Sequence, residues 1–167
     1  MRVYPTQERL LELFEYNCLD GSFERIKDVG RCYKKGTVTF GSKLSTGYLS
    51  ICVDGYRSQA HRLAWIISNG DIQCGLQIDH INRDRSDNRL CNLRLVTHME
   101  NGHNQKLRAT NTSGYTGVSW CRQHNKWRAE IKVNYKRIHL GYFDIPEEAS
   151  TVYLNAKKIH HPSSPIE

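Results

Sequence analysis

The residues whose types and spacing best fit a chemical site are Asp79, His80, Asn92 and Asn101. Hydrolysis of a phosphodiester needs a base that activates water and a cation that neutralises the charge growing on the phosphate and the leaving oxygen. A histidine, with an ordinary pKa near 6.5, suits the first task at neutral pH. A carboxylate with an amide oxygen suits a hard cation such as Mg²⁺. These residues therefore indicate metal-assisted phosphodiester hydrolysis.

The elements around these residues are expected in the order strand, loop, strand, helix. Residues 76–80 (LQIDH) read as a short strand, NRDRSDNRLCN (82–92) as a polar loop and residues 92–96 (NLRLV) as a second strand. Thr97 and Glu100 have the spacing of a capping box, which predicts that a helix starts there.

A ββα hairpin of this kind can bring Asp79, at the end of a strand, and Asn101, one turn into the helix, to one ion. His80 is expected to point the other way, because successive residues of a strand face opposite sides. A local bulge or bend must correct this if His80 and Asp79 serve one phosphate.

Each of these residues also has a purely structural interpretation. An Asp-His pair at the end of a strand often forms a turn or a cap. Asn92 could close the polar loop, and Asn101 could be a solvated helix position. His98 and His103 flank Asn101 and could be surface residues or substitute ligands.

Composition limits the class of protein. The 167 residues fit one domain or two small ones, and a hydrophobic content of 38% with a mean hydropathy of −0.64 allows modest cores. No apolar run reaches the ~18 residues of a membrane span, and residues 1–20 lack the layout of a signal peptide. Six scattered cysteines without a C-x-x-C pair argue against a zinc knuckle and suit free thiols in a reducing compartment. We therefore expect a cytoplasmic protein with no membrane partner.

The net charge of +7 lies in one segment. Residues 105–142 contain eight basic residues and a single acid, Glu130, whereas residues 1–104 carry +2 and residues 143–167 carry −2. Such a concentration of positive charge is typical of a surface that binds a polyanion such as nucleic acid. The alternative is a solvated cluster that keeps the protein in solution.

The remaining elements complete an α+β expectation. We expect a short amphipathic helix within residues 6–16, a β-hairpin around Asp54-Gly55 and a buried helix over residues 61–68. Residues 126–134 and 136–143 alternate between apolar and polar side chains, which predicts strands of an antiparallel sheet. Among the apolar side chains, Ile138 and Leu140 are expected to face inward. A helix opened by Pro146 is expected to pack on this three-stranded sheet.

The stretch from HRLAW (61–65) through IDHINRDRSDNRLCNLRLVTHMENGHN (78–104) resembles the HNH endonuclease family, specifically the subgroup found among phage- and intron-encoded homing enzymes. The resemblance implies a ββα-metal fold in a nuclease module of residues 1–105, with its core at 61–105. It also implies an intracellular enzyme, encoded by a phage or mobile element in a bacterial host.

The resemblance assigns roles residue by residue. His80 would be the general base, and Asp79 and Asn101, which stands where other branches carry histidine, would bind a divalent metal. We expect Mg²⁺, with Mn²⁺ or another divalent ion as alternatives. Asn92 would pin the loop and orient His80, and His61 of the HRL motif is expected to have a packing or hydrogen-bonding role.

A second resemblance lies within residues 113–161, where SGYTGVSW, KWRAEIKV and RIHLGYFDIPEEAS are similar to the Apetala-type DNA-binding domain of plant ethylene-response factors. It implies a DNA-binding domain over residues 113–162, joined to the nuclease module by a linker at 106–112. In that family the polar face of the sheet lies in the major groove of double-stranded DNA. The expected DNA-binding residues here are Arg122, Lys126, Arg128, Glu130, Lys132, Arg137 and His139. Thr116 and His139 replace an arginine and a tryptophan of the plant proteins, so the plant target sequence does not transfer.

These observations together predict a metal-dependent DNA endonuclease with an N-terminal catalytic module and a C-terminal sheet that reads duplex DNA. A monomer would nick one strand, whereas a double-strand break would need a homodimer or rebinding. The first alternative is a non-catalytic DNA-binding regulator that retains a nuclease scaffold, although a scaffold does not need all four site residues. RNA binding is a weaker alternative, because the expected sheet lacks the exposed aromatic pair that stacks unpaired bases.

Overall fold

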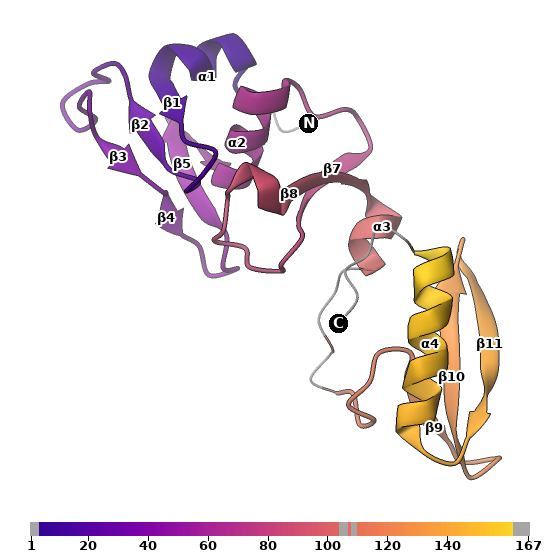
Figure 1. The fold of residues 1–167 in the computed structure, drawn as a ribbon. Helices are drawn as coiled ribbons and strands as arrows, with labels where there is room; N and C mark the ends of the chain where they lie inside the picture. The colour runs from indigo at the N-terminus through magenta and orange to yellow at the C-terminus, as the bar shows by residue number, and fades with distance from the viewer. Residues whose placement is uncertain (1–3, 104–106, 108–109, 162–167) are drawn as a thin grey trace. The chain divides into compact units, whose positions relative to one another are not determined.

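An Asp-Gly pair, a capping box and a proline mark turns and helix starts along the chain. The computed structural model describes residues 4–103, 107 and 110–161, so residues 106, 108 and 109 of the expected linker 106–112 lie outside the described residues. The chain divides into two units between Asn101 and Gly102 (Figure 1). Both contain helices and small antiparallel sheets, which confirms the α+β class.

The first unit contains α1 (Gln7–Leu13), β1 (Phe14–Tyr16), β2 (Phe23–Arg25), β3 (Val38–Thr39), β4 (Ser42–Lys43), β5 (Leu49–Val53), β6 (Tyr56–Gln59), α2 (Ala60–Asn69), β7 (Leu76–His80), a 3₁₀ turn (Leu90–Asn92) and β8 (Leu93–Thr97). The division falls within α3 (His98–His103). The second unit contains β9 (Val118–Cys121), β10 (Lys126–Val133), β11 (Lys136–Phe143) and α4 (Pro146–His160).

The first unit has three small sheets around one core: β1-β2-β3, β4-β5-β6 and β7-β8. The predicted hairpin is confirmed as β5–β6, where Asp54 and Gly55 adopt φ of 48° and 83°. Positive φ at both central residues is what a two-residue hairpin turn requires. The buried side chains that hold the sheets to α1 and α2 include Leu10, Phe14, Phe23, Leu63 and Ile66.

The predicted ββα order is confirmed by β7, β8 and α3. The capping box at the start of α3 is formed in both directions, as the backbone N–H of Thr97 donates to Glu100 Oε2 at 2.8 Å and that of Glu100 donates to Thr97 Oγ1 at 3.2 Å. Strands β7 and β8 pair in unbroken register, with Asp79 opposite Arg94 and His80 opposite Leu93. The bulge or bend that His80 was expected to need is therefore not found within this pairing.

The second unit is a sheet of order β11-β10-β9 with α4 packed along one face (Figure 1). Its small core contains Val118, Ala129 and Ala149. Gly117 adopts a φ of 73° next to the ring of Tyr153, and a Cβ at this position would collide with that ring. Only glycine fits this close approach between β9 and α4.

A β-bulge interrupts the pairing of β10 with β11. Ala129 pairs with Gly141 and Glu130 with His139, so Leu140 is an extra residue on β11. The expectation that Ile138 faces inward agrees with the register, which places it opposite the buried Ile131, although on this edge strand its side chain remains 38% exposed. The bulge also reverses the alternation of the residues that follow it.

The six cysteines lie within the described residues and are free thiols, as their spacing predicted. None of the helices in the described part of the chain is long and apolar enough to cross a membrane.

Candidate active site

The two faces of β7 carry different sets of candidate residues. Gln77 and Asp79 share one face, and His80 lies on the other, as the two-residue period of a strand requires. The structure thus places the expected metal ligand and the expected base on opposite sides of the strand, at its last two residues.

Asp79 is held by an ion pair with Arg94 on the neighbouring strand. Its Oδ2 accepts hydrogen bonds from Arg94 Nε at 2.9 Å and from Arg94 Nη2 at 2.7 Å. The two side chains are only 10% and 18% exposed, so the pair is largely shielded from water. A charge-assisted contact of this kind fixes the carboxylate and compensates the cost of burying its charge.

Asn101 is linked to the same face through Gln77. Its Nδ2 donates to Gln77 Oε1 at 2.8 Å, and Gln77 Nε2 lies 3.4 Å from Nδ1 of His98. The hydrogen bond to Gln77 orients the amide of Asn101 and does not use its Oδ1. Asp79, Asn101 and His98 therefore belong to one side of the hairpin, whereas the side chain of His103 lies outside the described residues.

His80 is enclosed on the other face by rings. It is 4% exposed, its ring packs edge-on against His61 at a centroid distance of 5.0 Å, and Tyr48 lies 5.9 Å away. Its Nε2 lies 3.2 Å from Asn88 Oδ1. Burial lowers the pKa of His80 below its ordinary value, more than the nearby hydrogen bond and carboxylates raise it. The imidazole is therefore neutral at pH 7, which is the form that accepts a proton.

His61, from the HRL motif, is also buried. Its Nδ1 has no hydrogen-bond partner among the described residues, and the ring contacts Tyr48 and His80. Burial, followed by the nearby His80 and Arg62, lowers the pKa of His61 to about 3. This side chain is therefore an uncharged ring that packs between its neighbours.

The depressed pKa of His61 predicts a pH-dependent stability. Its contribution is fully present above pH 6.5 and is lost as pH falls toward about 3, because the unfolded chain takes up the proton first. Between about pH 7.5 and about pH 5 we expect the free energy of unfolding to fall by about 2 kcal/mol from this residue alone. Urea unfolding at the two pH values should show a smaller fall in His61→Phe than in the unchanged protein. An identical fall in both would mean that His61 is not buried as a neutral ring.

Asn92 ties together the two ends of the loop that follows His80. Its Oδ1 accepts from the backbone N–H of Asn82 at 2.9 Å, and its Nδ2 donates to the carbonyl of Asp87 at 2.8 Å. Its own carbonyl accepts from the N–H of Ile81 at 2.9 Å. Loop and strand end are thus held by one buried amide.

The expected DNA-binding residues lie mainly on the face of the C-terminal sheet opposite α4. The strand register places six of them there: Lys126, Arg128, Glu130, Lys132, Arg137 and His139. Arg122 is exposed in the turn that joins β9 to β10. Two of the positive charges are partly compensated, since Lys126 pairs with Asp144 at 3.2 Å and Arg128 with Glu130 at 3.3 Å.

Tyr142 joins this face, although simple alternation places it on the other side from His139. The bulge at Leu140 brings the ring of Tyr142 to 4.5 Å from His139 and 4.2 Å from His124. Tyr142 is 38% exposed. The face therefore carries a tyrosine between two histidines, which the sequence pattern did not indicate.

The sequence patterns did not identify three further residues around the site: Gln77, Asn88 and Arg94. Gln77 had a signal, since it lies two residues before Asp79 on the same face. Arg94 had none, because only the observed register of β7 with β8 puts it opposite Asp79. Asn88 had none, because the path of an irregular loop cannot be read from its residues.

Comparisons with known proteins match the part of the chain that contains this site. The family model described as HNH endonuclease matches residues 58–103. Protein 3.8 of Escherichia phage T7 is 33% identical over 100 residues, which are 60% of this chain and 83% of that protein. No solved structure matches the chain significantly. The matched residues include the whole of β7, β8 and the loop between them.

Proposed function

Because this chain belongs to the HNH endonuclease family, we propose that it is a metal-dependent endonuclease that hydrolyses phosphodiester bonds in double-stranded DNA. The observation that carries the proposal is the neutral, enclosed His80 at the end of β7, next to a buried carboxylate within the matched segment. We further propose that it is encoded by a phage or mobile element and acts in the bacterial cytoplasm.

His80 is the general base in this proposal. Its imidazole takes a proton from the water that attacks the phosphorus, the bond from the phosphorus to the 3′-oxygen breaks, and this oxygen takes a proton from solvent water. The family resemblance implies products with 5′-phosphate and 3′-hydroxyl ends. Because the pairing of β7 with β8 contains no bulge, the proposal requires that one phosphate at the end of β7 is reached from both faces of the hairpin.

The residues on the Asp79 face fit a hard divalent cation. The Asp79 carboxylate is already paired with a positive group, and the hydrogen bond of Asn101 leaves its Oδ1 for another ligand. Within the described residues, no three His, Cys, Asp or Glu side chains gather as a metal site, so the donors offered are one carboxylate and amide oxygens. A cation held by Asp79 and Asn101, most suitably Mg²⁺, would neutralise charge on the phosphate and the leaving oxygen.

Substituting a proposed metal ligand should raise the metal concentration that cleavage requires. In Asp79→Ala and in Asn101→Ala we expect the Mg²⁺ concentration for half-maximal cleavage to rise about 10- to 100-fold, or activity to be lost. Asp71→Ala is the matched control, since Asp71 is an exposed carboxylate in the same unit. A titration curve identical to that of Asp71→Ala would remove the substituted residue from the site, and His98 would be tested next.

The C-terminal unit is proposed to read DNA. The support is its concentration of positive charge and the shared outward face of Lys132, Arg137 and His139. In this arrangement residues 1–105 form the nuclease module and residues 113–162 the DNA-binding domain, joined by residues 106–112.

Incubation with supercoiled plasmid tests the function directly. The protein should convert the plasmid to nicked or linear product with Mg²⁺ or Mn²⁺ and leave it intact with chelator. Accumulation of nicked circles before linear DNA would indicate a monomer that cuts one strand, and direct linearisation would indicate a homodimer.

A non-catalytic DNA-binding regulator is the second candidate function. It is favoured by the engagement of Asp79 with Arg94, because this ion pair already occupies the carboxylate that the endonuclease proposal assigns to the cation. Tight DNA binding without cleavage under any divalent ion would support this alternative.

A further inference from the structure

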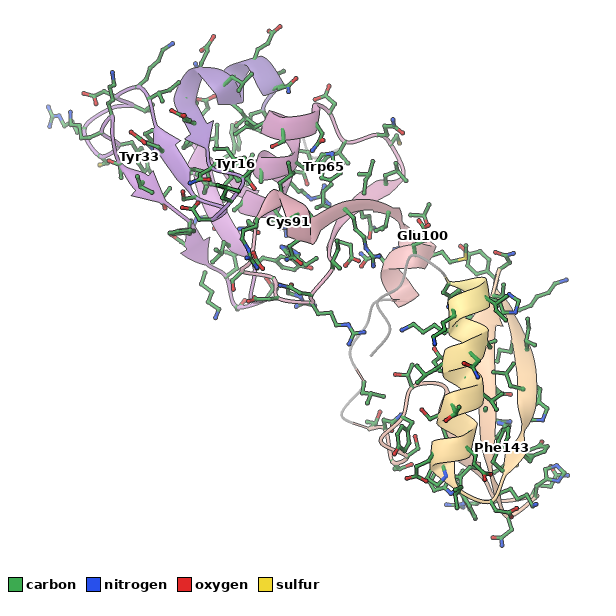
Figure 2. All side chains as sticks on the ribbon, viewed as in Figure 1. Tyr16, Tyr33, Trp65, Cys91, Glu100 and Phe143 are labelled. Atoms are coloured by element: carbon green, nitrogen blue, oxygen red, sulfur yellow. The ribbon has the colours of Figure 1, made fainter. Side chains whose placement is uncertain are left out.

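The segment before the matched residues 58–103 contacts the loop that follows His80. The hydroxyl of Tyr16, on β1, donates to the backbone carbonyl of Asn88 at 2.6 Å, and the N–H of Leu90 donates to the carbonyl of Cys18 at 3.3 Å. Figure 2 labels Tyr16 on its strand. Residues 72 positions apart in the chain are thus joined at Asn88.

Gly21 packs closely against the same part of the loop, at Asn88 and Arg89. It adopts a φ of 81°, and a Cβ at this position would lie 2.9 Å from the carbonyl carbon of Asn88 and 3.0 Å from the nitrogen of Arg89. Both neighbours are backbone atoms, which cannot move aside as a flexible side chain does. Tyr16 and Gly21 therefore fix the backbone of Asn88 from the N-terminal segment.

The side chain of Asn88 points inward to His80. It is 2% exposed, and its Oδ1 lies 3.2 Å from Nε2 of His80. Its Nδ2 is buried without a hydrogen-bond partner among the described residues. Leaving a buried donor without a partner costs free energy. We therefore read the contact of Asn88 Oδ1 with the ring nitrogen of His80 as the interaction that this orientation of the amide serves.

We propose that Asn88 is a positioning residue for His80. Tyr16 and Gly21 contribute to this positioning because they fix the backbone of Asn88. Asn88 Oδ1 accepts from Nε2–H of His80, which orients the ring and places its proton on Nε2. The Nδ1 atom then carries the lone pair that accepts a proton from water. The role in cleavage rests on the proposed function, whereas the tautomer of His80 does not.

The size of the effect follows from the role of an orienting group. A general base works only in the correct tautomer and direction, and a misplacement of about 1 Å can cost on the order of 10² in rate. DNA affinity should change little, because Asn88 is buried and neutral.

Two substitutions at Asn88 in the full-length chain test the proposal. In Asn88→Ala we expect kcat for plasmid cleavage to fall about 100-fold, with the Kd for DNA within about two-fold. Asn88→Asp should recover most of the rate, because a carboxylate of the same size still accepts from Nε2–H. Equal loss in both variants, or full activity in Asn88→Ala, would overturn the proposal.

Nuclear magnetic resonance of ¹⁵N-labelled histidines in metal-free protein adds a readout that does not depend on activity. His80 should be the Nε2–H tautomer in the unchanged protein and in Asn88→Asp, and should lose this preference in Asn88→Ala. If the unchanged protein cleaves no DNA, the endonuclease proposal fails. The spectrum still tests whether Asn88 sets the tautomer of His80.

The N-terminal contacts have their own matched controls. Tyr16→Phe should lower kcat several-fold, and Tyr56→Phe, at a tyrosine that is 78% exposed, should not. Gly21→Ala should lower kcat further than Gly36→Ala, because Gly36 has the same φ of 81° but open space around it. Thermal unfolding identifies any variant that fails to fold. Equal rates for Tyr16→Phe and Tyr56→Phe would show that the N-terminal segment does not position the site.

Discussion

Replacing His80 with alanine is expected to abolish DNA cleavage while leaving DNA affinity nearly unchanged. A positioned base contributes on the order of 10²–10⁴ in rate. One neutral, enclosed imidazole attracts phosphate weakly, and the burial that lowers the pKa of His80 keeps it neutral at pH 7. Single-turnover cleavage and fluorescence anisotropy on the same DNA would measure the two quantities separately.

The control for this substitution must separate chemistry from packing. His80→Ala removes a ring that packs against His61, so some loss of stability is expected from the space left behind. Urea unfolding gives that loss, and cleavage is then measured where the variant is fully folded. His160→Ala, at an exposed histidine near the end of α4, should behave as the unchanged protein. Parallel loss of cleavage and binding in His80→Ala would assign His80 a structural role.

The parts of this site that follow local rules could be predicted from the sequence. The capping box of Thr97 and Glu100 and the turn at Asp54-Gly55 depend on residues next to one another in the chain, and both are found. The opposite directions of Asp79 and His80 follow from the period of a strand in the same way. The same rule implied that a bulge or bend would be needed if both residues serve one phosphate, and the pairing of β7 with β8 contains none.

Contacts that depend on distant segments could not be predicted. The ion pair of Asp79 with Arg94 needs the register of two strands, which is set across the whole loop between them. The contact of Tyr16 with Asn88 needs the path of that loop and the packing of the N-terminal segment on it. Neither residue type nor spacing carries this information.

The C-terminal sheet shows how one irregularity changes a surface. Alternation correctly places Lys132 and Arg137 outward, because their pairing precedes the bulge. Beyond Leu140 the pattern reverses, and Tyr142 moves to the charged face beside His139. A bulge has no fixed sequence signature, although Gly141 in the strand is a weak one.

Removal of the C-terminal unit is expected to weaken DNA binding strongly and to reduce its dependence on salt. Each phosphate contact contributes about 0.9 to the slope of log K against log salt concentration on duplex DNA. If about four of the basic residues beyond Arg108 contact phosphates, the slope should shrink by roughly three to four units. The first unit should fold alone, because its core lies upstream, and should cleave weakly with less sequence preference.

A full-length variant makes the same test without shortening the chain. Lys126 and Arg128 are already ion-paired, so the exposed Lys132, Lys136 and Arg137 are expected to contribute most of the salt dependence. Changing these three to glutamine should lower the slope by about 2.7 units if each contacts a phosphate.

The matched control changes three exposed lysines of the first unit, Lys27, Lys35 and Lys43, to glutamine. Both triple variants lose the same formal charge, so a general effect of net charge would lower the slope equally in both. A larger fall in the sheet variant assigns the phosphate contacts to the C-terminal face. A larger fall in the lysine variant would instead mean that the N-terminal unit binds the DNA through a local basic surface at residues 27–43, although its net charge is close to zero.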